Sequence, residues 1–349
     1  MLSSEPARTF RPLASFLAWR AWQLELPANG FAAYPKNMKL FVTGASGYIG
    51  QVVVEHAVKA GHTVEGLARN EDSVRKVERL GATPVVGDLG SSAVLAAAAM
   101  RADAVLHLAY THDFSLDYSV VIDVEVKAVA ALVEGAGRKP VVTTSGTAVV
   151  APAPDGGETN EDSVINEGFV LGKRIHAERA VLKMAEQGAH TVAVRLQPYV
   201  YGRGGSFFVP ALMQQAAKHG VSAWVDGPRK RTSDVDVDDV ARFYLLAAQA
   251  APAGALYNCT GETDISTEEL AQAVGEALGV PARSLPRTEV QALWGEFLTD
   301  FVDYDNRPSS GKARRELGWH PQAAYGLLED IVKGSYRELA ARLRVGQTA

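Results

Sequence analysis

Three glycines spaced three residues apart, Gly44, Gly47 and Gly50, directly follow a short apolar run. Residues 51–60, just after them, have the pattern of a helix. Between a strand and a helix, such glycines allow a tight turn, a close approach of the backbone to a pyrophosphate, and close packing of the helix. The helix start then offers free N–H groups to the phosphates. The pattern predicts a dinucleotide-binding site. The predicted set also includes three neighbours in the turn: Ser46, Tyr48 and Ile49.

The end of the second predicted strand bears on which dinucleotide fits. A site for NAD usually has Asp or Glu there, about 20 residues past the glycines, where it binds the ribose hydroxyls. This strand ends with Ala68 and Arg69, and Glu65 lies earlier within it. Arg69 could pair with a 2′-phosphate through its planar guanidinium, or it is an ordinary solvated arginine. The first interpretation predicts NADP, with NAD as the alternative.

Strand-like and helix-like segments alternate along the chain. Strands are predicted over 39–43, 63–68, 83–86, 104–108, 141–144 and 191–196, and helices over 51–60, 73–80, 92–100 and 120–135. Apolar runs separated by amphipathic segments indicate a parallel sheet covered on both faces. The expected fold class is α/β, a Rossmann-type doubly wound parallel sheet with a smaller C-terminal substrate-binding α/β region. Ligands of such sheets bind at the carboxyl ends of the strands.

Three parts of the chain are expected. Residues 1–37 are interpreted as a translated leader or disordered tail, because Met38 stands where the first strand starts. Their arginines and serines also allow a mitochondrial transit segment. Residues 38–197 form the dinucleotide-binding domain, and 198–349 are mainly substrate-binding, with some segments returning to the large sheet. In this second part a helix is predicted over 267–278, with Ser266 and Glu269 as its capping box.

Composition limits the classes of partner. The 349-residue chain has a net charge of −5, which argues against nucleic acid as the main partner. No apolar run reaches the roughly 18–20 residues that a membrane span needs. The single cysteine, Cys259, excludes an intrachain disulfide and a Cys-x-x-Cys zinc site. We therefore expect no metal, no membrane association and a small-molecule substrate. A reducing compartment such as the cytoplasm fits these features.

Further short motifs follow the glycine turn in order. They are Gly87-Asp88-Leu89, His107-Leu108-Ala109, Thr144-Ser145-Gly146, Arg195 to Gly202, Val235 to Asp239 and Leu317 to Pro321. Over about residues 38–340 the chain resembles an extended short-chain dehydrogenase/reductase of the NAD-dependent epimerase/dehydratase family. The resemblance implies that Asp88 and Leu89 flank the adenine, that Ala109 lies at the middle of the dinucleotide, and that Ser145 faces the nicotinamide. It also implies a homodimer through helices over 120–135 and 173–185.

The family normally uses Ser with a Tyr-x-x-x-Lys pair on one helix. The Lys charge lowers the pKa of the phenol, so the Tyr can exchange a proton with the substrate oxygen. Here the helix expected over 169–178 has no tyrosine. If Lys173 takes the lysine place, Phe169 takes the tyrosine place. If Arg174 takes it, as the position of Glu178 four residues on suggests, Val170 does. The site is therefore atypical in either alignment.

Other side chains must then carry the chemistry. The predicted catalytic residues are Ser145, Arg174, Lys173 and His112. Arg174 is a poor proton donor but can stabilise negative charge on oxygen. Lys173 or His112 could give a proton, and His112 has the more suitable ordinary pKa, about 6.5. Tyr110 is a third candidate donor, although we expect it to pack beside the cofactor.

Two classes of function remain open. In the first, the chain is an NAD(P)-dependent oxidoreductase that acts on a carbonyl or alcohol of a small molecule. In the second, it binds the dinucleotide without turnover, as a sensor or scaffold. Four aromatic residues of the later part could line a substrate pocket or the core: Tyr201, Phe207, Phe208 and Trp224. Residues 229–231, Arg-Lys-Arg, are interpreted as a solvated basic turn, with binding of an anionic substrate such as a nucleotide sugar as the alternative.

Overall fold

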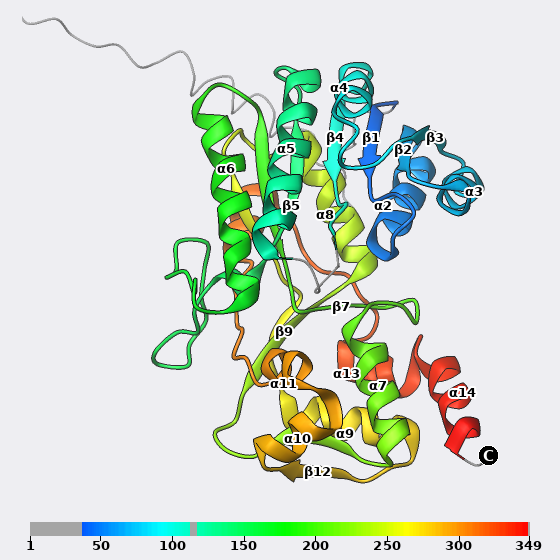
Figure 1. Ribbon diagram of the computed structural model, residues 1–349, viewed down its shortest axis with the longest axis vertical. Helices are drawn as coiled ribbons and strands as arrows, with labels where there is room; N and C mark the ends of the chain where they lie inside the picture. Colours follow the sequence, from blue (N-terminus) through cyan, green and yellow to red (C-terminus); the bar gives the residue numbers. More distant parts are fainter. Residues whose placement is uncertain (1–36, 112–116, 348–349) are drawn as a thin grey trace, which may run out of the picture. The chain divides into compact units, whose positions relative to one another are not determined.

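The computed structural model describes residues 37–111 and 117–347. Its main feature is a seven-stranded sheet in the order β10-β6-β5-β4-β1-β2-β3, with every neighbouring pair parallel (Figure 1). The α/β doubly wound fold class is thereby confirmed. The strands are β1 (Lys39–Thr43), β2 (Thr63–Ala68), β3 (Thr83–Val86), β4 (Ala104–His107), β5 (Val141–Gly146), β6 (Thr191–Leu196) and β10 (Leu256–Cys259).

Helices cover both faces of this sheet because alternate residues of each strand point to opposite sides. In β1, Leu40 and Val42 face the cluster that includes Val53, whereas Phe41 faces the cluster that includes Leu95 and Leu132. The first cluster is covered by α2 (Tyr48–Lys59), α3 (Glu71–Arg79) and α8 (Val237–Ala250), and the second by α4 (Ser92–Arg101) and α5 (Tyr118–Ala136). The direction of strand order reverses between β1 and β4, where ligands of open sheets bind.

The segment before α6 differs from the sequence expectation. The α-helix begins only at Ile175 and ends at Glu186, and residues Val170–Arg174 form a 3₁₀ turn instead. The prediction of one continuous helix over 169–178 is therefore wrong in its first half. In a 3₁₀ turn side chains three apart share a face, so residues four apart do not.

Later segments form a second region with its own apolar cluster, drawn in the lower part of Figure 1. Its sheets are β7 (Tyr199–Tyr201) with β9 (Arg231–Asp236) and β11 (Glu262–Ser266), and β8 (Ser222–Val225) with β12 (Ala282–Leu285). Its helices are α7 (Phe208–His219), α9 (Thr267–Leu278), α10 (Arg287–Trp294), α11 (Glu296–Val302), α13 (Leu327–Lys333) and α14 (Arg337–Gln347). The short α12 (Gly311–Leu317) returns to the large sheet near β10.

The prediction for α9 is confirmed residue by residue. Ser266 caps it, and the reciprocal hydrogen bonds with Glu269 complete the capping box. Over the described ranges, no helix combines the length and apolar character that crossing a bilayer requires. Residues 1–36, which hold almost all of the expected leader, lie outside the described residues.

Candidate functional site

The glycine turn joins β1 to α2 with very little space. Gly44 has φ +71°, and a Cβ on it would stand 2.7 Å from the Ala109 nitrogen. A Cβ on Gly50 would stand 2.0 Å from the Gly44 carbonyl oxygen. The Gly47 N–H donates to that same oxygen at 2.9 Å, and α2 starts at the next residue. The turn therefore brings the start of α2 and the end of β4 together, as a cradle for a pyrophosphate requires.

Three neighbours of these glycines are also placed at the turn. The Tyr48 hydroxyl donates to the Gly202 carbonyl at 2.7 Å, so its ring is tied to the loop after β7. Ile49 is half-buried against the core cluster of the large sheet. Ser46 is half-buried, and its carbonyl accepts from Gln51 at 3.1 Å. The side chains of Tyr48 and Ile49 hold the turn in place, and the helix start leaves its backbone N–H groups for a ligand.

A cavity of about 390 Å³ opens at the ends of β2 and β3. Its lining is Asn70, Glu71, Val74, Arg75 and Val86, and Val86 is 69% exposed although apolar. Arg69 is exposed at the end of β2, immediately before Asn70, which caps α3 by accepting from Ser73 at 2.9 Å. An exposed apolar side chain beside a helix start suits the adenosine part of a dinucleotide.

The loop after β3 is held by its own aspartate. Asp88 accepts from the Gly90 N–H at 3.0 Å and from the Ser91 hydroxyl at 2.8 Å. Leu89 packs half-buried against the cluster under α4. These contacts give Asp88 and Leu89 a structural role in shaping the end of β3, whichever ligand lies over it.

Arg174 lies at the centre of a polar cluster at the ends of β4 and β5. Its Nη2 donates to the Thr144 carbonyl at 2.8 Å and lies 3.4 Å from Glu125 Oε1. Its Cζ stands 4.1 Å above the centre of the Tyr110 ring, a cation–π contact. The side chain is 16% exposed, and Nε has no hydrogen-bond partner within the described part of the chain. The arginine is therefore held by three elements and retains an unused donor.

Glu125 is the anion that balances Arg174 in this cluster. It projects from α5 with its side chain 7% exposed, and burial raises the pKa of its carboxyl in spite of the nearby guanidinium. Burial of Arg174 lowers its pKa, but Glu125 and two tyrosines outweigh burial, and the pKa of the guanidinium is raised. Glu125 was not among the sequence-predicted site residues. The sequence held one indication of its position: Glu125 lies seven residues after Tyr118, so the two residues share a face of α5.

Ser145 is the second-last residue of β5 and follows Thr144, whose carbonyl Arg174 binds. The residue is 4% exposed, and its Oγ has no hydrogen-bond partner among the described residues. A buried hydroxyl without a partner is costly. The preceding Thr144 donates from Oγ1 to the His107 carbonyl at 2.8 Å and pairs with Tyr244 at 2.6 Å. Thr144 is thus tied to β4 and to α8, directly before Ser145 in β5.

His107 ends β4 beside this cluster. Its Nδ1 pairs with the Thr43 hydroxyl at 2.8 Å, and the same hydroxyl accepts from the Ala109 N–H at 3.2 Å. Burial, with the charge of Arg174, lowers the pKa of His107 to about 4. The imidazole is therefore neutral near pH 7. Its role is to fix the backbone of Ala109 against the glycine turn.

The remaining predicted catalytic residues are placed differently. Lys173 is exposed and does not join the Arg174 cluster. Phe169 stacks on Tyr304 with ring centroids 4.6 Å apart, and the Tyr304 hydroxyl donates to the Val150 carbonyl at 2.6 Å. His112 lies outside the described residues. The structure thus places Arg174 on the carbonyl of Thr144, the residue before Ser145, and leaves Lys173 exposed.

The aromatic candidates of the second region are mostly core residues. Tyr201 is 3% exposed and donates to the Tyr325 carbonyl at 2.6 Å, and Phe208 stacks on Phe301. Trp224 is half-buried in β8, and Phe207 is 57% exposed beside Phe208. Of these four, only Phe207 presents a largely exposed aromatic side chain to a ligand.

The basic turn over 229–231 is paired with carboxylates. Arg229 lies 3.1 Å from Glu269, and Arg231 forms an ion pair with Asp264.

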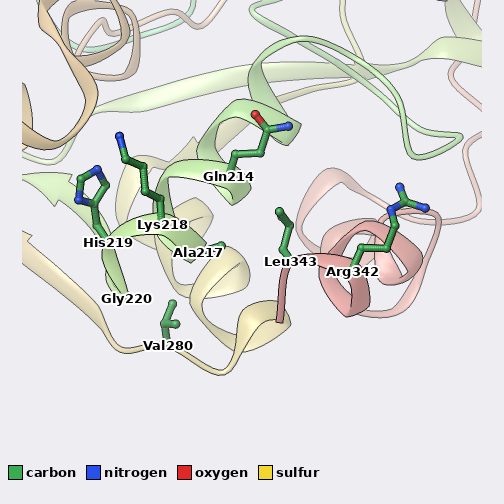
Figure 2. A pocket seen from close by; sticks show the side chains of 8 residues that line it. All are labelled: Gln214, Ala217, Lys218, His219, Gly220, Val280, Arg342 and Leu343. Atoms are coloured by element: carbon green, nitrogen blue, oxygen red, sulfur yellow. The ribbon is translucent and has the colours of Figure 1, made fainter. Parts of the chain in front are cut away.

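A larger cavity, about 750 Å³, lies between α7 and α14 (Figure 2). Its lining is Gln214, Ala217, Lys218, His219, Gly220, Val280, Arg342 and Leu343. None of these eight residues follows a strand of the large sheet, where ligands of this fold bind.

The site fits a nicotinamide dinucleotide by the observations above. A Cβ on Gly44 or Gly50 would collide with neighbouring backbone, so the compact turn needs glycine at both positions. Helix α2 begins within this turn, at Tyr48. At the ends of β4 and β5, Ser145 Oγ and Arg174 Nε are buried donors without a hydrogen-bond partner among the described residues. Within the described ranges, no three His, Cys, Asp or Glu side chains are grouped so that they could hold a metal ion.

Comparisons with known proteins agree with this geometry. A model of the NAD-dependent epimerase/dehydratase family matches residues 40–260. An uncharacterized protein of Saccharomyces cerevisiae is 34% identical over 298 residues, 84% of this chain and 98% of the yeast protein. The 4-hydroxy-2-methyl-3-oxo-4-farnesyl-3,4-dihydroquinoline-1-oxide ketoreductase of Stigmatella aurantiaca is 29% identical, over 81% of this chain and 92% of that protein.

Solved structures share the fold. The structure of MoeE5 in complex with UDP-glucuronic acid and NAD aligns with a TM-score of 0.68 at 22% identity, over 87% of this chain and 99% of that one. The chain belongs to the NAD-dependent epimerase/dehydratase family, within the short-chain dehydrogenase/reductase superfamily of NAD(P)-dependent oxidoreductases.

Proposed function

We propose that this protein is an NADPH-preferring reductase of a small-molecule carbonyl, working without the usual helix tyrosine. The observation that carries the proposal is the buried, unpartnered hydroxyl of Ser145, adjacent to the carbonyl that anchors Arg174. Two preorganised donors, the Ser145 hydroxyl and Arg174 Nε, stand where the fold places the reacting end of its ligand. Buried donors are usually paired, so a ligand oxygen that accepts from either atom would remove the cost of leaving it unpaired.

The two residues have complementary roles in this proposal. Ser145 donates a hydrogen bond to the substrate oxygen and orients the carbonyl. Arg174 stabilises negative charge as it develops on that oxygen, and Glu125 holds the guanidinium in place. A bound reduced nicotinamide supplies the hydride to the carbonyl carbon. Removing one such donor from a site of this kind typically costs about 10²–10³ in rate.

Preference for NADPH rests on the end of β2. Arg69 is exposed next to the start of α3, and no acidic residue ends the strand. Glu71 lines the same cavity, but its side chain is 94% exposed and pairs with Arg75 at 3.4 Å. The guanidinium of Arg69 suits a 2′-phosphate, while NAD is the cofactor named for the structural relative MoeE5.

The substrate class follows the relatives and the second region. The Stigmatella relative is named a ketoreductase, and Phe207 gives the second region an exposed aromatic side chain. We further propose a homodimer through α5 and α6, since Val120 on α5 is apolar and 49% exposed. The buried, unbonded Cys259 supports a cytoplasmic site of action.

A second candidate function is a dinucleotide sensor or scaffold without turnover. One observation favours this function. If Lys173 takes the lysine place, the tyrosine place is taken by Phe169, whose ring is stacked on Tyr304 and has no hydroxyl. The two candidates differ in whether the hydroxyl of Ser145 has a chemical role. Both share the cofactor site at the glycine turn.

Thermal shift with NADPH and NADH, followed by a carbonyl panel read by nicotinamide absorbance, tests the proposal. We expect binding of both dinucleotides, a larger shift with NADPH, and turnover on at least one ketone or aldehyde. Ser145→Ala should lose most turnover and keep dinucleotide binding, whereas the exposed Lys173→Met serves as the matched control for Arg174→Met. Binding without any turnover across the panel would favour the sensor.

A further inference from the structure

The hydroxyl groups of Tyr110 and Tyr118 form a pair beside Arg174. Tyr110 stands three residues past the end of β4, and Tyr118 is the first residue of α5. The Tyr110 hydroxyl donates to the Tyr118 hydroxyl at 3.0 Å. Both side chains are half-buried. Because Tyr110 follows the end of β4, the hydroxyl pair lies near the carboxyl edge of the sheet, where ligands bind.

The same cation holds Tyr110 and the residue before Ser145. The guanidinium carbon of Arg174 lies 4.1 Å from the Tyr110 ring centre, while Nη2 binds the Thr144 carbonyl. A phenol, a cation and a strand-end hydroxyl are the three groups that the common site of this superfamily assembles from Tyr, Lys and Ser. Here the phenol comes from the loop after β4 and the cation from the 3₁₀ turn before α6.

We propose that Tyr110 gives the proton to the substrate oxygen during carbonyl reduction, with Tyr118 relaying a replacement proton. This rests on the proposed reductase function. The carbonyl carbon gains the hydride as its C=O π bond opens, so the carbonyl is reduced by two electrons and the nicotinamide is oxidised. The O–H bond of Tyr110 breaks while an O–H bond forms on the substrate. The Tyr110 phenolate takes a proton from Tyr118, which recovers one from solvent.

Electrostatics around Tyr110 agree with a donor that works in the reducing direction. Burial raises the pKa of Tyr110, while the charge of Arg174 and the hydroxyl of Tyr118 oppose that rise and Glu125 adds to it. The phenol therefore stays protonated at neutral pH, and its phenolate has two stabilising partners once the proton has left. The other described candidates lack these features, because Lys173 is exposed and His107 is neutral at this pH.

Tyr110→Phe and Tyr118→Phe test the assignment, with the 45% exposed Tyr325→Phe as the matched control. With a substrate that the wild-type protein reduces, single-turnover hydride transfer should fall about 10²–10⁴-fold in Tyr110→Phe, with NADPH affinity unchanged. Tyr118→Phe should retain partial activity, and the fall of rate at alkaline pH should move to higher pH. Tyr325→Phe should behave as the wild type.

A second readout needs neither cofactor nor turnover. In the protein labelled at tyrosine Cζ, the resonance that disappears in Tyr110→Phe should titrate at higher pH in Tyr118→Phe, because the phenolate loses a hydrogen bond. Wild-type rates in Tyr110→Phe would overturn the assignment and leave the reductase function intact. A slower Tyr110→Phe combined with an unmoved titration in Tyr118→Phe would also overturn it, since that result describes packing alone. A wild type that binds NADPH but reduces no carbonyl would reject both proposals.

Discussion

Arg195 on β6 and Glu178 on α6 form a buried ion pair with two parallel hydrogen bonds. Nε and Nη2 of Arg195 donate to the two carboxylate oxygens at 2.9 and 2.7 Å, and the side chains are 2% and 1% exposed. Nη1 also donates to the Glu161 carbonyl at 3.2 Å. This pair fixes the first turn of α6 on the sheet, four residues after Arg174. Because Arg174 directly precedes α6, the pair anchors the helix that follows the cation of the candidate site.

Glu178→Ala should destabilise the protein by about 3–5 kcal/mol, because it leaves the Arg195 guanidinium buried without a counter-charge. Urea denaturation followed by circular dichroism measures the change. Glu167→Ala is the matched control, since its pair with Arg179 at 2.8 Å has both side chains 53% exposed and should cost under about 1 kcal/mol. The double variant Glu178→Leu, Arg195→Met should recover most of the loss. A cost for Glu178→Ala no larger than that of the control would contradict the argument.

Gly50→Ala and Gly47→Ala should separate folding from binding. A methyl group at residue 50 would stand 2.0 Å from the Gly44 carbonyl oxygen, so we expect a loss of about 1–3 kcal/mol or more. At residue 47 the nearest atom is the same oxygen at 3.2 Å, and the residue is exposed. Gly47→Ala should therefore stay folded and lose dinucleotide affinity. Thermal melts with and without NADPH distinguish the two, and full NADPH binding by Gly47→Ala would place the pyrophosphate elsewhere.

Arg69→Ala should weaken NADPH binding about tenfold to a hundredfold and leave NADH binding nearly unchanged. The expected size is that of one charge-assisted hydrogen bond, about 1.5–3 kcal/mol. Isothermal titration with each dinucleotide provides the two affinities. Arg79→Ala, on the last turn of α3, is the control for a general loss of positive charge. Equal weakening of NADPH and NADH by Arg69→Ala would remove this residue from the choice of cofactor.

Asp234 in β9 should make stability depend on pH. Burial raises the pKa of Asp234 to about 7, and its Oδ2 has no hydrogen-bond partner in the part of the chain described. The folded state therefore binds a proton that the unfolded state, with a pKa near 3.9, has already released. The stability that this group contributes is present below about pH 4 and is lost as the pH rises through about 7.

Asp234→Asn should then raise the free energy of unfolding on the order of 2–4 kcal/mol at about pH 8 and change it little at about pH 4. The variant keeps an oxygen to accept the Glu262 N–H, which Asp234 binds at 3.1 Å. Chemical denaturation at the two pH values measures the difference, with the exposed Asp155→Asn as control. A gain of equal size at both pH values would mean that Asp234 is not the titrating group.

Local patterns predicted much of the fold. The bounds of β1, β2, β3 and β6 agree with the apolar runs, and α9 starts and ends as its capping box and following glycine require. In contrast, α2 begins at Tyr48, three residues before the predicted start, because the glycine turn itself caps it. Short-range signals of this kind act within a few residues, so one sequence is enough to identify them.

The polar cluster depended on tertiary packing. The choice between Lys173 and Arg174 could not be made from spacing, because both follow from a helix that is here a 3₁₀ turn. Glu125 looked like an ordinary polar residue of an amphipathic helix, and only the packing of α5 beside the 170–174 turn places it against Arg174. Tyr110 and Tyr118 are separated by residues 112–116, which lie outside the described residues, and the pairing of their hydroxyl groups follows from the fold and not from a local pattern.

The 3₁₀ turn at Val170–Arg174 also limits how this site could be converted into the common one. Phe169 lies stacked on Tyr304, while Lys173, four residues on, is exposed. Since three residues complete a 3₁₀ turn, a tyrosine introduced at 169 would have no lysine on its own face. A single Phe169→Tyr substitution therefore supplies the phenol without the lysine that the common pair requires. Rebuilding the Tyr-x-x-x-Lys pair here requires α-helical backbone over this segment as well as the tyrosine.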